Sequence, residues 1–133
     1  ARVFFTEVHN GGFFINPYSP NILKYWFEFN DFQWEHGGNP FMGAILGNCL
    51  KEAGYKSVGL QVKSLFFDAR EPKEKRKFLI DFLELIMSSE SYLKKAGRVT
   101  EKEVAGVKKE IRNLLKNKRA VYHLDYVRAE ARA

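Results

Sequence analysis

The sequence predicts a small α/β domain, with some α+β character, in which about four helices cover a three-stranded sheet. Two observations lead to this fold class. Runs typical of β-strands begin at residues 3, 58 and 121, and segments with helical spacing of apolar residues separate them. Because these helical segments are long, parallel and antiparallel pairing of the strands are both possible, and periodicity alone does not decide between them.

The first strand is expected over residues 3–8, an apolar run that the turn-forming residues 9–12 bring to an end. Residues 13–16 then form a short extended or irregular piece. Ser19 and Pro20 are residue types that favour a helix N-cap and the first helical position. The first helix is therefore expected over residues 20–36, ending before two glycines.

The same kinds of residue mark where the later helices and strands begin and end. A second helix begins at Asn39-Pro40 and ends at Gly54, and alternation over residues 58–67 predicts the second strand. One long helix runs from residues 68–72 to Gly97. Thr100 and Glu103 form a capping box before the last helix, and alternation over residues 121–131 predicts the third strand.

The composition is that of one folded domain covering residues 1–133. Hydrophobic residues make up 45% and aromatic residues 15%, which excludes a disordered chain. The single cysteine, Cys49, cannot form an intrachain disulfide, which agrees with a cytoplasmic location. The first residues lack the features of a signal peptide and an initiator methionine, so we expect that the chain was cut from a longer polypeptide.

The net charge of +6 would permit contacts with nucleic acid or an anionic membrane. Most of the cations between residues 94 and 119 lie opposite an apolar stripe, and no aromatic residues alternate with them as in proteins that bind single strands. No apolar run is long enough to span a membrane. We therefore expect a solvated basic surface and neither a nucleic-acid nor a membrane partner.

Three segments carry a resemblance to a known family. Residues 1–12, Ala-Arg-Val-Phe-Phe-Thr-Glu-Val-His-Asn-Gly-Gly, resemble the fifth strand of class I S-adenosylmethionine-dependent methyltransferases and its loop. Residues 37–55, ending in Lys-Glu-Ala-Gly-Tyr, resemble the helix that leads into the sixth strand. Residues 96–104 and the last strand resemble C-terminal segments. In this order they cover nearly the whole chain, which is thus similar to the C-terminal, substrate-side half of such an enzyme.

This resemblance implies that the last strand inserts antiparallel between the other two, in a mixed three-stranded sheet. It also implies that the full-length protein is a methyltransferase whose cofactor is S-adenosylmethionine. The family's glycine-rich loop and its ribose-binding acidic residue are absent, and Gly11-Gly12 lacks the third glycine of a dinucleotide loop. The isolated chain is therefore expected to bind no cofactor and to be inactive.

Glu7, His9 and Asn10 are expected at the carboxyl end of the first strand, where open α/β sheets bind ligands. Glu7 and His9 are candidate catalytic residues, because a carboxylate or an imidazole there can remove a proton during methyl transfer. Asn10 is a candidate for binding the substrate. The alternative is a polar turn in which Asn10 adopts a left-handed conformation.

Apolar side chains cover most of the circumference of the helix at residues 20–36, whereas an ordinary surface helix shows one stripe. The helix is either a substrate lid, with rings that line a pocket or hold a cation, or a core element. With Asn10, the candidate substrate-binding residues are Tyr18, Tyr25, Trp26, Phe29 and Trp34.

His36 and His123 have no cysteine or carboxylate partners at metal-ligand spacing, so no metal site is expected. Cys49 lies on an apolar helix face, which favours an inert buried thiol.

If the first strand is the family's fifth, its usual neighbour is absent and it presents an apolar edge. We expect a homodimer joined through edge strands or aromatic helices, and the alternative is a compact monomer.

The alternative to the methyltransferase is a stand-alone domain that binds a small ligand or another protein. A glycine-rich strand–loop–helix encoded upstream would favour the methyltransferase.

Overall fold

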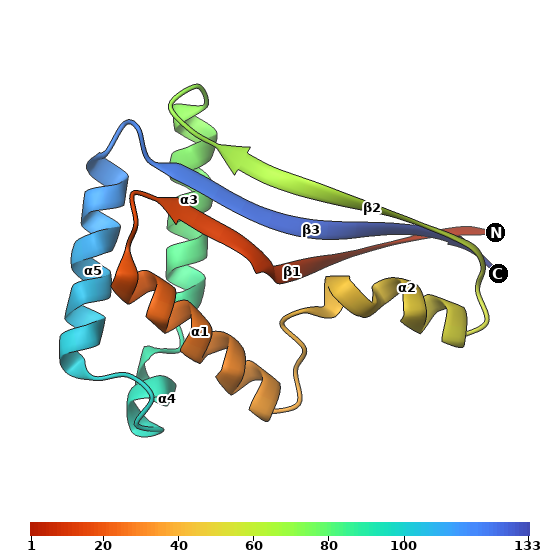
Figure 1. Cartoon of the computed structure of the whole chain (residues 1–133), viewed down its shortest axis with the longest axis horizontal. Helices are drawn as coiled ribbons and strands as arrows, with labels where there is room; N and C mark the ends of the chain where they lie inside the picture. Colours follow the sequence, from red (N-terminus) through yellow and green to blue (C-terminus); the bar gives the residue numbers. More distant parts are fainter. The chain divides into compact units, whose positions relative to one another are not determined.

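A computed structural model describes all residues, 1–133, as a mixed α/β fold with one three-stranded sheet (Figure 1). This confirms the fold class expected from the sequence. In chain order the elements are β1 (Arg2–Asn16), α1 (Pro20–Glu35), α2 (Met42–Glu52), β2 (Lys56–Phe67), α3 (Pro72–Met87), α4 (Glu90–Lys95), α5 (Glu101–Lys116) and β3 (Val121–Arg132).

The last strand of the chain is the central strand of the sheet, whose order is β1-β3-β2. Both pairings are antiparallel, and the two outer strands run in the same direction on either side of β3 (Figure 1). The expected place of the last strand between the other two is therefore confirmed. The sheet is antiparallel and not mixed as expected, because β1 and β2 each pair only with β3. The expected bounds of β2 and β3, residues 58–67 and 121–131, also agree with the structure to within two residues.

The expected end of the first strand at the turn-forming residues 9–12 is wrong. β1 continues without a break through Asn10, Gly11 and Gly12 to Asn16. The reason is pairing with β3: a Cβ atom on Gly12 would lie 2.4 Å from Oδ2 of Asp125, so the glycine allows that carboxylate to lie against β1. The residue types favour a turn, but the neighbouring strand keeps the backbone extended.

The chain divides into two compact units, and every strand contributes to both. Unit 1 comprises Ala1–Phe13, Asn39–Leu65 and His123–Ala133. In its core, Leu46 and Leu50 of α2 pack against alternate residues of β3, namely Val127, Ala129 and Ala131. The small alanines and the period of two present one flat face of β3 to the helix.

Unit 2 comprises Phe14–Gly38 and Phe66–Tyr122 and contains α1, α3, α4 and α5. Its core follows the apolar stripes that the sequence shows on these helices. The fully buried side chains are Ile22 and Tyr25 of α1, Leu79 and Ile86 of α3, Leu93 of α4, and Val104, Val107 and Leu114 of α5.

The single long helix expected from residues 68–72 to Gly97 is wrong, because it is broken into α3 and α4 at Ser88-Ser89. The Ser88 hydroxyl donates to the carbonyl oxygen of Leu85 at 2.6 Å, and the Ser89 hydroxyl donates to that of Ile86 at 2.5 Å. These local bonds compete with the backbone ladder of a continuing helix. Gly97, with a φ of +72°, follows α4 and stops it as expected.

The helices α1 and α5, whose first residues were expected from capping signals, differ in how they are capped. At α5, Thr100 accepts a hydrogen bond from the backbone N–H of Glu103 at 3.1 Å, so the predicted capping box is confirmed. At α1, Pro20 takes the first helical position, but the hydroxyl of Ser19 donates to the carbonyl oxygen of Pro17 instead of capping the helix. Glu110 of α5 supplies the acceptor that Ser19 does not.

Candidate functional site

A polar cluster in unit 1 is centred on the carboxylate of Asp125 in β3. The hydroxyl of Ser64 in β2 donates a hydrogen bond to Oδ1 of Asp125 at 2.6 Å. Nε2 of His123 lies 2.9 Å from the same oxygen, and Gly12 of β1 faces the other oxygen. All three strands thus contribute to one site that combines a carboxylate, an imidazole and a hydroxyl group.

Sheet geometry explains why these residues meet. His123 and Asp125 are two residues apart on β3, so their side chains point to the same face. Ser64 is a cross-strand neighbour near the carboxyl end of β2, and Gly12 lies in the second half of β1. The cluster therefore lies within the sheet, in the second half of both outer strands and before either of them ends.

The cluster can hold or move a proton. A carboxylate beside an imidazole fixes the orientation of the ring, as general acids and bases require. The His123 side chain is partly buried, at 14% exposure, and the Asp125 side chain is somewhat more exposed, at 23%. Sequence reasoning considered His123 only as a metal ligand. The signal that it missed is His-Leu-Asp, whose alternation places both polar groups on one face of β3.

The structure does not place Glu7, His9 and Asn10 at the end of β1, so that part of the expectation is wrong. They lie in the middle of the strand, because β1 extends to Asn16. The His9 ring packs edge-on against Phe41, and its Nδ1 atom is buried without a hydrogen-bond partner. The backbone N–H of Asn10 donates to the carbonyl oxygen of Pro40 at 3.1 Å, and its side chain is buried.

The aromatic candidates for substrate binding, which lie in α1 or just before it, separate into a buried group and an exposed group. Trp26 is 4% exposed, stacks on Phe29 with ring centroids 5.7 Å apart, and contacts Phe82 of α3. The Tyr25 hydroxyl donates to the carbonyl oxygen of Ile86 at 2.8 Å, and burial raises the pKa of this phenol. Tyr25, Trp26 and Phe29 therefore pack in unit 2 and do not line an open pocket.

Tyr18 and Trp34, in contrast, are 76% and 58% exposed. The structure therefore does not bring the proposed substrate-binding residues into one group. Unit 1 contains Asn10, and unit 2 contains both the buried aromatic side chains and the exposed ones.

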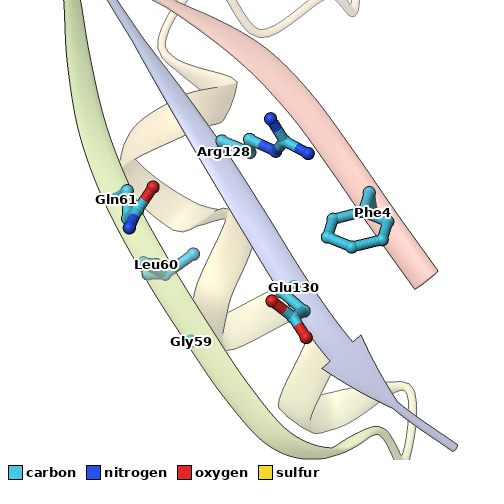
Figure 2. A pocket seen from close by; sticks show the side chains of 6 residues that line it. All are labelled: Phe4, Gly59, Leu60, Gln61, Arg128 and Glu130. Carbon is cyan, nitrogen blue, oxygen red and sulfur yellow. The ribbon is translucent and has the colours of Figure 1, made fainter. Parts of the chain in front are cut away.

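A second candidate in unit 1 is a cavity of about 380 Å³ over the open face of the sheet (Figure 2). Figure 2 shows Arg128 reaching from β3 toward Phe4 of β1, and the guanidinium carbon lies 5.0 Å from the ring centroid. Arg2 lies on the same ring at 5.5 Å and donates to Glu130 at 2.5 Å. Arg2 pairs with Glu130 and both arginines lie over the Phe4 ring, so the cavity has the character of an exposed surface ion pair.

A polar cavity of about 580 Å³ in unit 2 contains a bidentate ion pair. Nε of Arg70 lies 2.9 Å from Oδ1 of Asp68, and a second guanidinium nitrogen lies 2.9 Å from Oδ2. The hydrogen bonds from Arg70 lower the pKa of Asp68 to about 2. Asn117 accepts from the backbone N–H of Arg119 at the same cavity. This geometry stabilises the loop before α3.

No group of three or more histidine, cysteine or acidic side chains is arranged to hold a metal ion. Nδ1 of His36 lies 2.8 Å from the carbonyl oxygen of Phe32, one turn earlier in α1, and the two rings are in contact. Cys49 is a free, half-buried thiol in α2.

No family model fits the chain, and no curated protein sequence matches it. None of the helices combines the length and apolar character that crossing a membrane requires.

Proposed function

We propose that the chain is the C-terminal, substrate-side half of a class I S-adenosylmethionine-dependent methyltransferase. The observation that carries this proposal is the strand order β1-β3-β2, in which the last strand is antiparallel and central. A chain in which the strands simply followed one another would have β2 in the middle. The resemblance of residues 1–12, 37–55 and 96–104 implies the observed order and gives it a functional meaning.

The residues of this chain do not fit the cofactor. The carboxylate group of the methyl donor would need free backbone N–H groups, such as those at the start of a helix that follows a strand. Here that helix is α1, and its first N–H groups, on Asn21 and Ile22, already donate to the carboxylate of Glu110. The methyl donor would have to be bound by residues outside these 133. Calorimetry of the isolated chain with S-adenosylmethionine should therefore detect no binding, and micromolar affinity would contradict the proposal.

Within the proposal, the Asp125–His123 pair is the proton acceptor for the methyl-accepting group. His123 has a carboxylate partner at 2.9 Å, whereas the other candidate, His9, packs against Phe41. Nδ1 is buried in both histidines, so His123 differs from His9 only by its carboxylate partner. Glu7 remains a candidate base. Tyr18 and Trp34 are exposed and remain candidates for binding the substrate, whereas Tyr25 and Trp26 are buried in the core of unit 2. The hydroxyl of Ser64, which donates to Oδ1 of Asp125 at 2.6 Å, supports this role because it holds the carboxylate in place.

The decisive experiment uses the complete reading frame that contains these residues. An upstream glycine-rich strand–loop–helix is expected, and its absence would overturn the proposal in favour of a stand-alone binding domain. In the complete protein, His123→Gln should lower kcat by about 10²–10⁴-fold without changing affinity for the methyl donor. His9→Gln is the matched control. If it lowers kcat as much as His123→Gln does, the assignment of the base is wrong.

A further inference from the structure

A cavity of about 520 Å³ lies in unit 2 between the first turns of α3 and the last turn of α5. These two helices are in contact. Its volume is within the range of about 300–1,000 Å³ that is usual for small-molecule sites. Leu79, Leu114 and Leu115 give it an apolar wall, and the first two are almost completely buried. An aliphatic or aromatic group would be removed from water there.

The charged groups that line this cavity are all cationic. Lys75, Arg76, Lys116 and Lys118 line it, and no aspartate or glutamate does. Arg76, Lys116 and Lys118 are exposed at its rim. An apolar wall with a cationic rim complements a molecule that has an apolar body and an anionic head group.

Lys75 is the distinctive residue of the cavity, because its side chain is 95% buried, with a relative exposure of 5%. Its ammonium group donates to the carbonyl oxygen of Lys118 at 2.8 Å and forms no ion pair. An ammonium group has three N–H donors, so one carbonyl does not satisfy it. Burying a charge without a counter-ion is costly, and the partial negative charge at the end of α5 offsets only part of that cost.

We infer that this cavity binds a small amphipathic anion, an aliphatic carboxylate of medium chain length. The carboxylate is the counter-ion of Lys75 and the rim cations, and the aliphatic chain lies on the leucines. Inorganic anions would leave the apolar wall uncovered, and neutral hydrocarbons would leave Lys75 unpaired. This site is separate from the Asp125 cluster, so the inference does not depend on the proposed methyltransferase function.

Calorimetric titration of the 133-residue chain with decanoate tests the ligand class. Saturable binding of one decanoate is expected. Acetate, which has the head group alone, and decyltrimethylammonium, which has the tail with the opposite charge, should not bind. Equal binding of the cationic amphiphile would overturn the inference. So would binding to phosphatidylglycerol vesicles without binding of decanoate, because the basic rim would then be a membrane-facing surface.

Substitutions locate the site. Lys75→Met keeps the aliphatic stem and removes the buried charge, so it should fold at least as stably as the parent and bind decanoate about tenfold more weakly or worse. Arg76→Glu should also weaken binding several-fold, about what one solvent-exposed charge pair provides. The matched control is Lys77→Glu, an equal charge change at the neighbouring exposed residue, which does not line the cavity. If Lys75→Met does not fold, Arg76→Glu decides, and equal affinities of the Arg76 and Lys77 variants would overturn the inference.

Discussion

The carboxylate of Glu110 in α5 accepts a hydrogen bond from the backbone N–H of Asn21 at 2.8 Å and thereby caps α1 from 89 residues away. It also accepts from the backbone N–H of Ile22 and from the side chain of Asn21, each at 3.1 Å. Gly106, one turn earlier in α5, makes room for this contact, since a Cβ atom there would lie 2.6 Å from Asn21. The carboxylate of Glu110 thus caps α1 in place of the side chain of Ser19, which makes no capping hydrogen bond.

Removing this cap should destabilise unit 2. Glu110→Ala leaves two backbone N–H groups at a helix start without an acceptor and should lower the free energy of unfolding by about 1–3 kcal/mol. Glu110→Gln keeps one acceptor oxygen and should lower it less. Urea unfolding followed by circular dichroism measures both. An alanine variant as stable as the parent would show that the carboxylate does not act as a cap.

Substitutions of Trp26 and Trp34, which lie on the same helix, distinguish the two interpretations of α1 as a core element or as a substrate lid. Trp26 is 4% exposed and contacts Phe29 and Phe82, so Trp26→Ala should lower the free energy of unfolding by about 3–5 kcal/mol. Trp34 is 58% exposed, and Trp34→Ala should change it by less than about 0.5 kcal/mol. If Trp26→Ala leaves stability unchanged, Trp26 is not a core residue and the lid interpretation is favoured.

Gly12 should not tolerate a side chain. A Cβ atom there would lie 2.4 Å from Oδ2 and 2.6 Å from Cβ of Asp125, so Gly12→Ala should cost about 1–3 kcal/mol of stability. Gly59 of β2 is the matched control, because the nearest atom to a Cβ there is 4.0 Å away. Adding Asp125→Gly to Gly12→Ala removes the clash, and the two substitutions should show favourable coupling in a double-mutant cycle. Strict additivity would contradict the contact.

Alkaline pH should destabilise the protein through Tyr122. Burial, assisted by the nearby charge of Asp81, raises the pKa of this phenol from 10.0 to about 12. Above pH 10 the unfolded chain therefore loses this proton while the folded chain keeps it, so stability falls as pH rises from about 10 to 12. The expected loss is about 2–3 kcal/mol.

Tyr122→Phe tests this assignment, because phenylalanine has no proton to lose. Urea unfolding at a series of pH values up to 12 should show a shallower decline in the variant than in the parent. Some decline will remain, since burial also raises the pKa of Tyr25. Identical slopes for the two proteins would show that Tyr122 does not contribute.

The edge of β1 should support self-association. β1 is an outer strand, and its exposed side chains include Phe4, Val8 and Phe14. Unpaired strand edges with apolar side chains are templates for pairing between chains, so we expect a homodimer. Val8→Lys should shift the mass toward that of the monomer. Light scattering across a dilution series measures this, and a constant mass of 15.5 kDa for the parent at high concentration would contradict the dimer.

The sequence by itself determined the elements whose signals are local. Alternation over residues 58–67 and 121–131 gave β2 and β3, and Thr100 with Glu103 marked the start of α5. Gly97 marked the end of α4 through a backbone conformation that other residues rarely adopt. Capping, alternation and glycine conformation act within a few residues, so they can be read along the chain.

Tertiary structure alone decided the features that depend on partners distant in sequence. Pairing with β3 kept β1 extended through Gly11 and Gly12, although these residue types favour a turn. The same sheet brought Ser64 to Asp125, a separation of 61 residues that no spacing rule reveals. Packing against α3 decided that Trp26 is buried, whereas Trp34 on the same helix is exposed. In each case the observed conformation is stabilised by a contact that exists only after the chain has folded.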